Sequence, residues 1–352
     1  MLFLIIKSQP MSNMLNKWNE FLKIRIKALP SSRLEGLFFS MLIKKESRHR
    51  NEKNSKLQQN FSLNNKMTLQ NHIVMSPMTT WSSNEDQTVS DAEIKYYGAR
   101  AKSAGMVITG SSHVQENGVG FANELGVYDD RFVPGLTKLA TAIKAGGARA
   151  VLQLNHAGDK ALPQFISNHD VVSSSAVSAL QTAFAPAQTP RALTESEILQ
   201  VIHDFGFATK RAIKAGFDGV EIHGAHGFLI QNFLSPHYNQ RTDKWGGNLK
   251  NRLRFAMAVV DEVQKVVSEY ADSSFIIGYR ITLEEREDDG LRLSDTEALI
   301  KKLIKKQIGY LHLSLGNALT SHSHYDDNSE PFIQRISKLV GMCQVLVGCA
   351  SN

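Results

Sequence analysis

The chain has 352 residues, of which 42% are hydrophobic and 21% are charged. This composition is that of a globular protein and excludes a disordered or fibrous chain. The apolar runs are too short to span a membrane, and two cysteines are too few for a disulfide framework, a zinc ribbon or a cysteine-ligated iron–sulfur cluster. The sequence therefore predicts a cytoplasmic protein without a membrane span.

The positive charge is concentrated near the N-terminus. The chain has 40 Lys and Arg against 34 Asp and Glu, and residues 1–60 hold 12 of the first group and 4 of the second. The remainder is slightly acidic, with 28 against 30. A run of charge specifies no partner by itself. We therefore expect residues 1–57 to be a basic extension, disordered or helical and without a nucleic-acid ligand, and residues 58–352 to form the folded domain.

From about residue 70, short apolar runs alternate with amphipathic segments, a pattern that predicts an α/β fold with a parallel sheet. Seven runs are typical of buried strands: Ile73–Met75, Met106–Thr109, Ala150–Leu154, Gly219–Ile222, Phe275–Tyr279, Tyr310–Leu313 and Val345–Val347. A closed TIM (β/α)8 barrel needs eight strands. We expect a TIM-type barrel truncated after the seventh strand, with two unpaired edges. A strand missed in the count and an open doubly wound sheet are the alternatives.

Three hydroxyl residues, each followed three positions later by glutamate, predict helix starts. The pairs are Ser90 with Glu93, Thr194 with Glu197, and Ser294 with Glu297. In each pair the hydroxyl and the carboxylate can accept hydrogen bonds from free backbone N–H groups of the first turn. After Thr194, apolar residues recur with helical spacing as far as Gly216, which predicts one long helix directly before a strand.

The densest polar cluster follows the fourth predicted strand. The strand ends in Glu221-Ile-His223-Gly-Ala-His226-Gly-Phe228, and Ser235-Pro236, Asn239, Arg241, Asp243 and Trp245-Gly246-Gly247 follow. Parallel strands present functional side chains at their carboxyl ends. An imidazole placed there can donate a hydrogen bond to a substrate oxygen or bind a metal. We therefore identify His223 and His226 as candidate catalytic residues.

This segment resembles the fourth-strand signature of the Old Yellow Enzyme family of FMN-dependent oxidoreductases, and the resemblance extends from about residue 58 to the end. It implies an FMN-binding barrel that is reduced by NADH or NADPH. The family passes hydride from the reduced flavin to an activated alkene, such as an enone. By this resemblance, His223 and His226 hydrogen-bond the carbonyl oxygen of a small-molecule substrate and stabilise the negative charge that develops there.

The resemblance also assigns residues on the first two strands to the flavin. Pro77, Met78 and Thr79 match the family segment whose backbone lies against the ring, with Thr79 near the flavin O4. Ser111 matches the small-residue segment that lets the backbone approach the ring. Trp81, which follows the first strand, is expected to line the substrate together with Phe228 and the two histidines.

Later strands supply the remaining cofactor residues. Gln153 matches the amide that binds the pyrimidine edge of the flavin, and a buried amide must find a partner. Arg280 matches the guanidinium near the flavin N1 and O2, and Lys160 lies near the basic residue of the family at the ring. Gly348 matches the glycine of the phosphate-binding strand end, beyond which the second half of that site is missing.

One side chain departs from the family pattern, because Phe228 stands where the family commonly has the tyrosine that protonates the α-carbon. Loss of one positioned general acid typically costs ~10²–10⁴-fold in rate, so quinones or oxygen become alternative acceptors. Two other interpretations remain open: a truncated, non-catalytic remnant of such an enzyme, and a metal-dependent barrel enzyme with His223 and His226 as ligands. A homo-oligomer also remains open.

Overall fold

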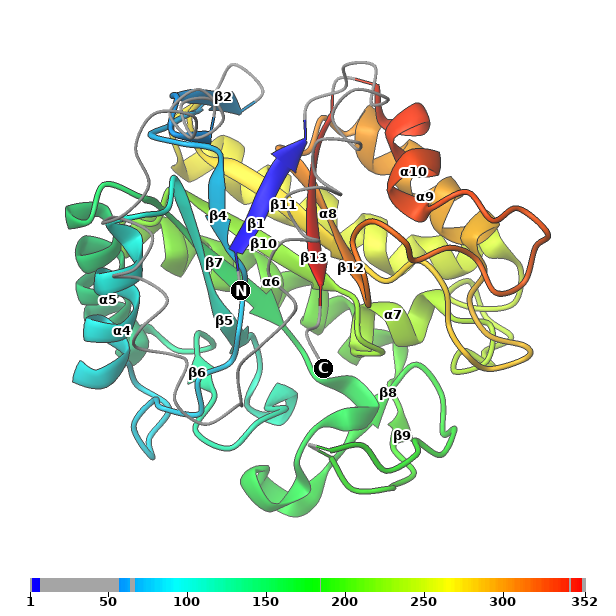
Figure 1. Ribbon diagram of the computed structural model, residues 1–352. Coiled ribbons are helices and arrows are strands. Elements are labelled where there is room, and N and C mark those ends of the chain that lie inside the picture. Colours follow the sequence, from blue (N-terminus) through cyan, green and yellow to red (C-terminus); the bar gives the residue numbers. More distant parts are fainter. Residues whose placement is uncertain (1, 7–56, 64–66, 184, 342, 350–352) are drawn as a thin grey trace, which may run out of the picture.

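The structure is a computed structural model that describes residues 2–6, 57–63, 67–183, 185–341 and 343–349. Its main sheet closes into a ring, because β4 pairs with β5 on one side and with β1 on the other (Figure 1). In spatial order the ring consists of β4 (Ile73–Met75), β1 (Leu2–Ile6), β13 (Gln344–Cys349), β12 (Tyr310–Leu315), β11 (Ile276–Ile281), β10 (Gly219–Gly224), β7 (Arg149–Asn155) and β5 (Met106–His113). The ninth strand of this sheet, β6 (Leu125–Gly126), pairs with the end of β5.

Seven strands of the ring run parallel, and each overlaps one of the seven predicted runs. This confirms the predicted barrel with seven parallel strands. Ring closure makes the alternative of an open doubly wound sheet wrong.

The eighth position of the ring is held by β1, which runs antiparallel to both neighbours. Phe3 pairs with Val74 of β4, and Ile5 pairs with Leu346 of β13 (Figure 1). The expectation of two unpaired edges is therefore wrong for the described part of the chain, because the backbone of β1 covers both of them. Five residues of the predicted N-terminal extension thus belong to the barrel, and residues 7–56 lie outside the described residues.

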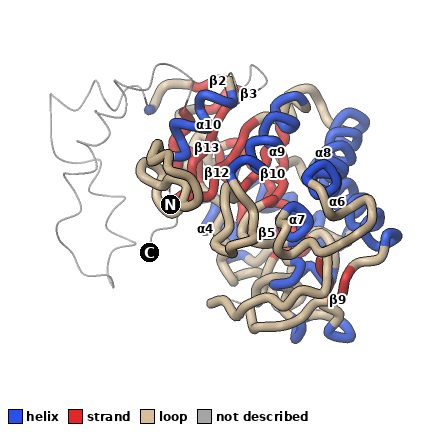
Figure 2. Tube along the Cα trace, turned by 90° about the vertical axis from the view of Figure 1, so that its right-hand side faces the viewer, coloured by secondary structure: helices blue, strands red, loops and turns tan. Residues whose placement is uncertain are grey.

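Helices pack around the outside of the strands (Figure 2). They are α4 (Asp91–Ala101), α5 (Val133–Ala145), α6 (Glu195–Lys214), α7 (Leu229–Leu234), α8 (Leu249–Tyr270), α9 (Leu293–Lys305) and α10 (Phe332–Val340). Single turns of 3-10 helix occupy Glu116–Gly118, Asp130–Phe132, Gly158–Lys160, Pro163–Phe165 and Ser167–His169. Within the described ranges, no helix is long and apolar enough to cross a membrane.

Two of the three predicted helix starts are confirmed. Ser90 and Thr194 form capping boxes with the glutamates three residues on, and α6 ends before Gly216, whose φ is +83°. The prediction at Ser294 is wrong, because α9 begins at Leu293 and its N-cap is Arg292. The guanidinium of Arg292 donates to the carbonyl oxygens of Leu291 and Glu287, which holds its backbone extended at this position.

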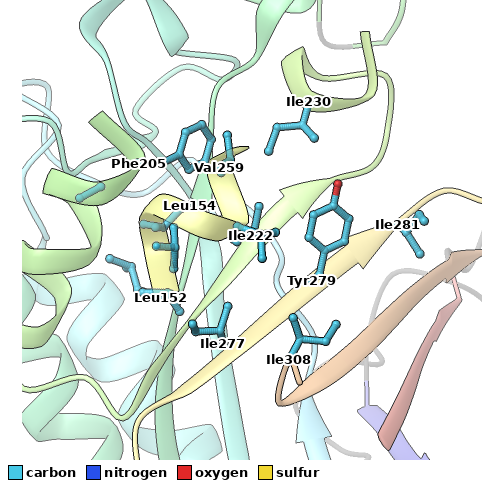
Figure 3. Close-up of a cluster of buried hydrophobic side chains, with 14 of the residues drawn as sticks. Leu152, Leu154, Phe205, Ile222, Ile230, Val259, Ile277, Tyr279, Ile281 and Ile308 are labelled. Atoms are coloured by element: carbon cyan, nitrogen blue, oxygen red, sulfur yellow. The ribbon is translucent and has the colours of Figure 1, made fainter. Parts of the chain in front are cut away.

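Among the described residues, two of the three buried hydrophobic clusters lie on opposite sides of the barrel wall, and the third surrounds Phe228. Outside the wall, Leu154 and Ile222 from the strands face Phe205 of α6 and Val259 of α8 (Figure 3). Inside the wall, an apolar layer fills the end at which the parallel strands start, and the hairpin of β2 (Phe61–Leu63) and β3 (Met67–Leu69) packs against it. This layer excludes water from one end, so ligands have access at the carboxyl ends of the strands.

We expect β1 to be needed for a stable barrel. Leu4→Pro removes a backbone N–H from the strand, and deletion of residues 1–6 removes the strand itself. Both changes should lower the midpoint of thermal unfolding and increase aggregation, measured by differential scanning fluorimetry and light scattering. Leu180→Pro, at an exposed position outside the strands, is the matched control. A deleted chain that unfolds at the same temperature as the full chain would contradict this role of β1.

Candidate functional site

A buried carboxylate lies in the middle of the barrel. Glu221 on β10 is fully buried, and in register it is the neighbour of Gln153 on β7 and of Gly278 on β11. Its oxygens accept hydrogen bonds from Gln153 Nε2 at 2.7 Å and from His312 Nδ1 at 2.9 Å. Burial acts to raise the pKa of Glu221, but His312, Arg280 and Gln153 outweigh it and the net pKa is lowered. Glu221 is therefore a fixed negative charge below the mouth of the barrel.

This carboxylate decides which end of the Gln153 amide is available to a ligand. The amide nitrogen is used by Glu221, and the backbone N–H of Gln153 donates to Thr109 Oγ1 at 3.2 Å. The carbonyl oxygen of the side chain remains as the acceptor. An amide held in this way fits a ligand that presents an N–H, as the pyrimidine edge of a flavin does.

A cation lies one layer above the carboxylate. Arg280 on β11 pairs in register with His223 of β10 and with His312 of β12. It is 9% exposed, and it donates from Nη2 to Ser314 Oγ at 3.3 Å. Burial lowers the pKa of Arg280 to about 10, so it stays charged at neutral pH. Its Nε–H has no hydrogen-bond partner among the described residues. An incompletely paired buried guanidinium fits a ligand edge on which negative charge collects.

The two predicted catalytic histidines lie together at the end of β10. Their ring centroids are 5.0 Å apart. His223 Nδ1 accepts from the backbone N–H of Ala225 at 3.3 Å, which leaves the proton of the neutral ring on Nε2. His226 Nε2 lies 2.6 Å from Ser314 Oγ, which also accepts from Arg280 Nη2 at 3.3 Å; the hydroxyl has one donor and two lone pairs, so it can either donate to this ring nitrogen or accept from it.

Both imidazoles are neutral at physiological pH. Burial, followed by the charges of His226 and Arg280, lowers the pKa of His223 well below its ordinary value. Loss of solvation, followed by the charge of Arg280, does the same for His226. The Nε2–H of His223 can therefore donate to an oxygen of a ligand, and His226 can do so through Nδ1 when its Nε2 accepts from Ser314.

The segment after β4 is held against the end of β5. The backbone N–H of Gly110 donates to the hydroxyl of Tyr97 at 2.7 Å, and that hydroxyl donates to the carbonyl of Met78 at 3.4 Å. A Cβ at Gly110 would lie 2.8 Å from the Met78 oxygen, so only glycine permits this approach. Pro77, Met78 and Thr79 thus form one fixed segment, with Pro77 buried and the other two partly open. This segment fits a flat ligand that rests on backbone.

Ser111 is placed beside this segment, but its hydroxyl is already used. It donates to Glu124 Oε1 at 2.5 Å, and Ser111 is only 4% exposed. Any contact of Ser111 with a cofactor would therefore involve its backbone. Gly348 pairs in register with Ser314 on the neighbouring strand, whose hydroxyl accepts from Arg280, and it lies two residues beyond Leu346, the register partner of His312.

The predicted substrate residues form an aromatic line. Trp81 is 49% exposed, and its ring lies 6.1 Å from that of Phe121. Phe121 lies 6.2 Å from Phe228, and Phe228 lies 5.0 Å from His223, all measured between ring centroids and all edge to face. The structure thus brings Trp81, Phe228 and both histidines to one place.

Lys160 supports the loop after β10 from below. Its Nζ donates to the carbonyl oxygens of His226 at 2.8 Å and of Gly227 at 3.1 Å. These two hydrogen bonds hold the backbone of the loop that follows β10. In this loop His226 has a φ of +62°, in the left-handed region. The expected contact of Lys160 with a flavin ring is therefore not its main interaction.

Four residues of this region have no role in the sequence-based predictions: Glu221, Glu124, Phe121 and His312. Glu221 carries a signal that could have found it, since a carboxylate in an otherwise apolar strand must be paired, the same argument that applies to Gln153. Glu124 and Phe121 lie in a loop, where no periodicity marks buried positions.

A family model described as the NADH:flavin oxidoreductase / NADH oxidase family matches residues 56–348. The chain belongs to this family. The Old Yellow Enzyme resemblance is thereby confirmed, and this oxidoreductase uses FMN and NAD(P)H as its cofactors. The side chains of Gln153 and Arg280 described above fit the ring edge of FMN. Within the described residues, no group of three His, Cys, Asp or Glu side chains could hold a metal ion.

Similar proteins include flavin oxidoreductases of different lengths. The probable NADH-dependent flavin oxidoreductase YqiG of Bacillus subtilis is 42% identical over 301 residues, which cover 86% of this chain and 80% of that protein. The NADH:acrylate oxidoreductase of Vibrio harveyi is 45% identical over 271 residues, which cover 77% of this chain and 27% of that protein. The chain therefore spans most of the first relative and about a quarter of the second.

Solved structures agree with the fold. Morphinone reductase in complex with tetrahydroNAD aligns with a TM-score of 0.71 at 26% identity, over 84% of this chain and 81% of that chain. An old yellow enzyme homologue from Zymomonas mobilis aligns with a TM-score of 0.73 at 24% identity, over 84% of this chain and 83% of that chain. The second likeness concerns the fold alone.

Asp159 gives this oxidoreductase a pH-dependent stability. It is fully buried beside Lys160, and burial raises its pKa to about 6 from 3.8, although Lys160 and Asn232 oppose the rise. The folded state therefore binds this proton more tightly than the unfolded state. Stability is unaffected below pH 4, falls as the pH rises to about 6, and stays reduced above it.

We expect Asp159→Asn to raise the free energy of unfolding at pH 7.5 by up to about 3 kcal/mol and to change it little at pH 4. Urea unfolding at the two pH values measures the difference. Asp327→Asn, at an exposed position, is the matched control. An equal effect of Asp159→Asn at both pH values would contradict a titrating carboxyl.

Proposed function

We propose that this oxidoreductase transfers hydride from NADH or NADPH to an activated alkene whose double bond is conjugated to a carbonyl group. The observation that carries the proposal is the pair of neutral histidines at the end of β10, with the Nε2–H of His223 available, above the buried charge of Arg280. Two similar proteins carry names that fit such an acceptor, the NADH:acrylate oxidoreductase and the NADH:fumarate oxidoreductase of Klebsiella pneumoniae. The chain covers 27% and 30% of them.

FMN, when bound, supplies the chemistry of accepting and donating hydride. The residues that would hold it are those already found at the barrel mouth. Pro77, Met78 and Thr79 would provide a backbone surface, Gln153 its side-chain carbonyl oxygen, and Arg280 its positive charge. Ser111 and Gly348 would contribute backbone on either side. Glu221 keeps Gln153 turned to this task and balances the charge of Arg280.

The histidines would hold the acceptor. His223 Nε2–H, and His226 Nδ1–H when Ser314 donates to His226 Nε2, would donate to the carbonyl oxygen of the alkene, where negative charge increases during reduction. Since His223 is buried and neutral, the bond that it donates is stronger than in water and needs no reorganisation. Trp81 and Phe228 would cover the apolar body of the acceptor.

A second candidate function is the oxidation of NAD(P)H with another final acceptor, such as a quinone or oxygen. Phe228 favours it, because phenylalanine cannot protonate the α-carbon of an alkene. A cytoplasmic location and a homo-oligomeric state remain predictions from the sequence. The two functions differ in whether a proton donor limits the rate.

We expect Arg280→Ala to weaken FMN binding ~10–100-fold, because it removes a charged hydrogen-bond donor from a buried site. Gln153→Ala should weaken it less, since its hydrogen bond is neutral. Titration of the apoprotein with FMN, followed by quenching of flavin fluorescence, measures both constants. Arg254→Ala, on the exposed face of α8, is the matched control. If Arg280→Ala bound FMN as tightly as Arg254→Ala, the proposed ring contact would be wrong.

Phe228→Tyr tests the choice between the two functions. If a missing proton donor limits alkene reduction, the tyrosine should raise kcat for 2-cyclohexenone by ~10-fold or more and leave the rate with a quinone unchanged. Phe121→Tyr adds a hydroxyl elsewhere on the aromatic line and serves as the control. Equal effects of Phe228→Tyr on both acceptors would argue against proton donation at this position.

A further inference from the structure

A second buried carboxylate lies beside the site and has no part in the function proposed above. Glu124 is fully buried in the loop between the 3-10 turn Glu116–Gly118 and β6. Its Oε2 accepts from the backbone N–H of Gly120 at 2.6 Å and of Phe121 at 3.2 Å, and its Oε1 accepts from Ser111 Oγ at 2.5 Å. One side chain thus joins the turn at Gly120 to the end of β5.

The base of this loop is held independently of Glu124. The carbonyl oxygens of Gly118 and Val119 accept from the backbone N–H groups of Ala157 and Leu162, both at 2.9 Å. A Cβ at Gly120 would lie 2.9 Å from the Cβ of Ala157, so the turn packs closely on the neighbouring loop. The part that depends on Glu124 is the turn itself, because its carboxylate satisfies two successive N–H groups that face the protein interior.

This turn sets the direction of the Phe121 ring. Phe121 is the middle member of the aromatic line, between Trp81 at 6.1 Å and Phe228 at 6.2 Å. Phe228 in turn contacts His223 at 5.0 Å. A change in the turn would therefore interrupt the apolar wall that leads from the histidines to solvent. The wall is rigid only if the backbone beneath Phe121 is rigid.

We propose that Glu124 is a positioning residue that fixes the Phe121 ring in the aromatic wall and thereby gives the enzyme a preference for acceptors with a planar apolar body. This inference rests on the proposed alkene reduction for its substrate class. The geometry of the carboxylate, the turn and the three rings carries the positioning role independently of that reaction.

Glutamine has the shape and the donors to replace Glu124. Its carbonyl oxygen can accept from the N–H groups of Gly120 and Phe121, and its amide can donate to the Ser111 hydroxyl, which is also an acceptor. Burial raises the pKa of Glu124 to about 7, so a neutral side chain at this place is already populated at neutral pH. Alanine offers no acceptor and leaves two buried N–H groups without a partner.

The test compares two aldehydes that share one reacting group, acrolein and cinnamaldehyde, which differ by a phenyl ring. In the holoenzyme, Glu124→Ala and Phe121→Ala should each raise KM for cinnamaldehyde ~10-fold and leave KM for acrolein within about twofold, because only the phenyl ring meets the wall. Glu124→Gln should behave as the unchanged protein. Glu116→Ala, an exposed glutamate at the start of the same loop, is the matched control.

Two further readouts do not depend on turnover. Glu124→Ala should shift the emission of Trp81 to longer wavelength, obtained by subtracting spectra of the same proteins with Trp81→Phe. It should also weaken binding of the saturated aldehyde 3-phenylpropanal about as much as Phe121→Ala does. If neither aldehyde is reduced by the unchanged protein, the proposed function fails, and these two measurements still decide the positioning role.

The inference would be overturned if Glu124→Ala changed both aldehydes equally, or if it altered neither Trp81 emission nor binding of 3-phenylpropanal. A failure of Glu124→Gln to preserve the preference for cinnamaldehyde would also overturn it. If Glu124→Ala does not fold, Phe121→Ala and Glu124→Gln decide the question. The role of Glu124 is supported if Phe121→Ala loses the preference for cinnamaldehyde and Glu124→Gln keeps it. Any other combination of results contradicts that role.

Discussion

Closure of the sheet into a ring is the constraint on which the site depends. Seven parallel strands place their carboxyl ends on one circle, so that Gln153, Glu221, Arg280 and His312 come from four strands and still lie in contact or in register. An open sheet would place these side chains along a line, with its two outer strands far apart. The antiparallel strand β1 completes the circle by pairing with β4 and β13. The backbone of this short segment therefore supports the site.

Inside the ring, charge is arranged in layers along the barrel axis. The apolar layer at the closed end excludes water, Glu221 lies above it, and Arg280 with the two histidines lies at the mouth. The buried negative charge of Glu221 is stabilised against the cost of desolvation by the charge of Arg280 and by the hydrogen bonds from Gln153 and His312. Glu221 in turn keeps the buried guanidinium of Arg280 charged and holds the side-chain amide of Gln153 in one orientation. The electrostatics of the mouth are thus decided one layer below the residues that a ligand would touch.

The mouth itself combines hydrogen-bond donors with an apolar wall. His223 and His226 are neutral donors, and Trp81, Phe121 and Phe228 extend from them to the surface. The wall includes no tyrosine hydroxyl, so it binds and orients without supplying a proton. This division suits an enzyme of the NADH:flavin oxidoreductase family whose side chains position and polarise while the cofactor carries the redox chemistry.

The sequence by itself determined the seven parallel strands, two of three helix caps, the histidine pair and the family. These features depend on local patterns: apolar runs, a hydroxyl three residues before a glutamate, and polar residues at one strand end. The tertiary structure alone decided the place of β1, the pairing of Glu221, the use of the Ser111 hydroxyl by Glu124 and the aromatic line through Phe121. Each of these features joins residues that are separated along the chain. Ser111 and Glu124 are 13 positions apart, and Glu221 and His312 are 91 positions apart. Such partners become neighbours only when the ring closes, because a side chain's hydrogen-bond partner is chosen by distance in space.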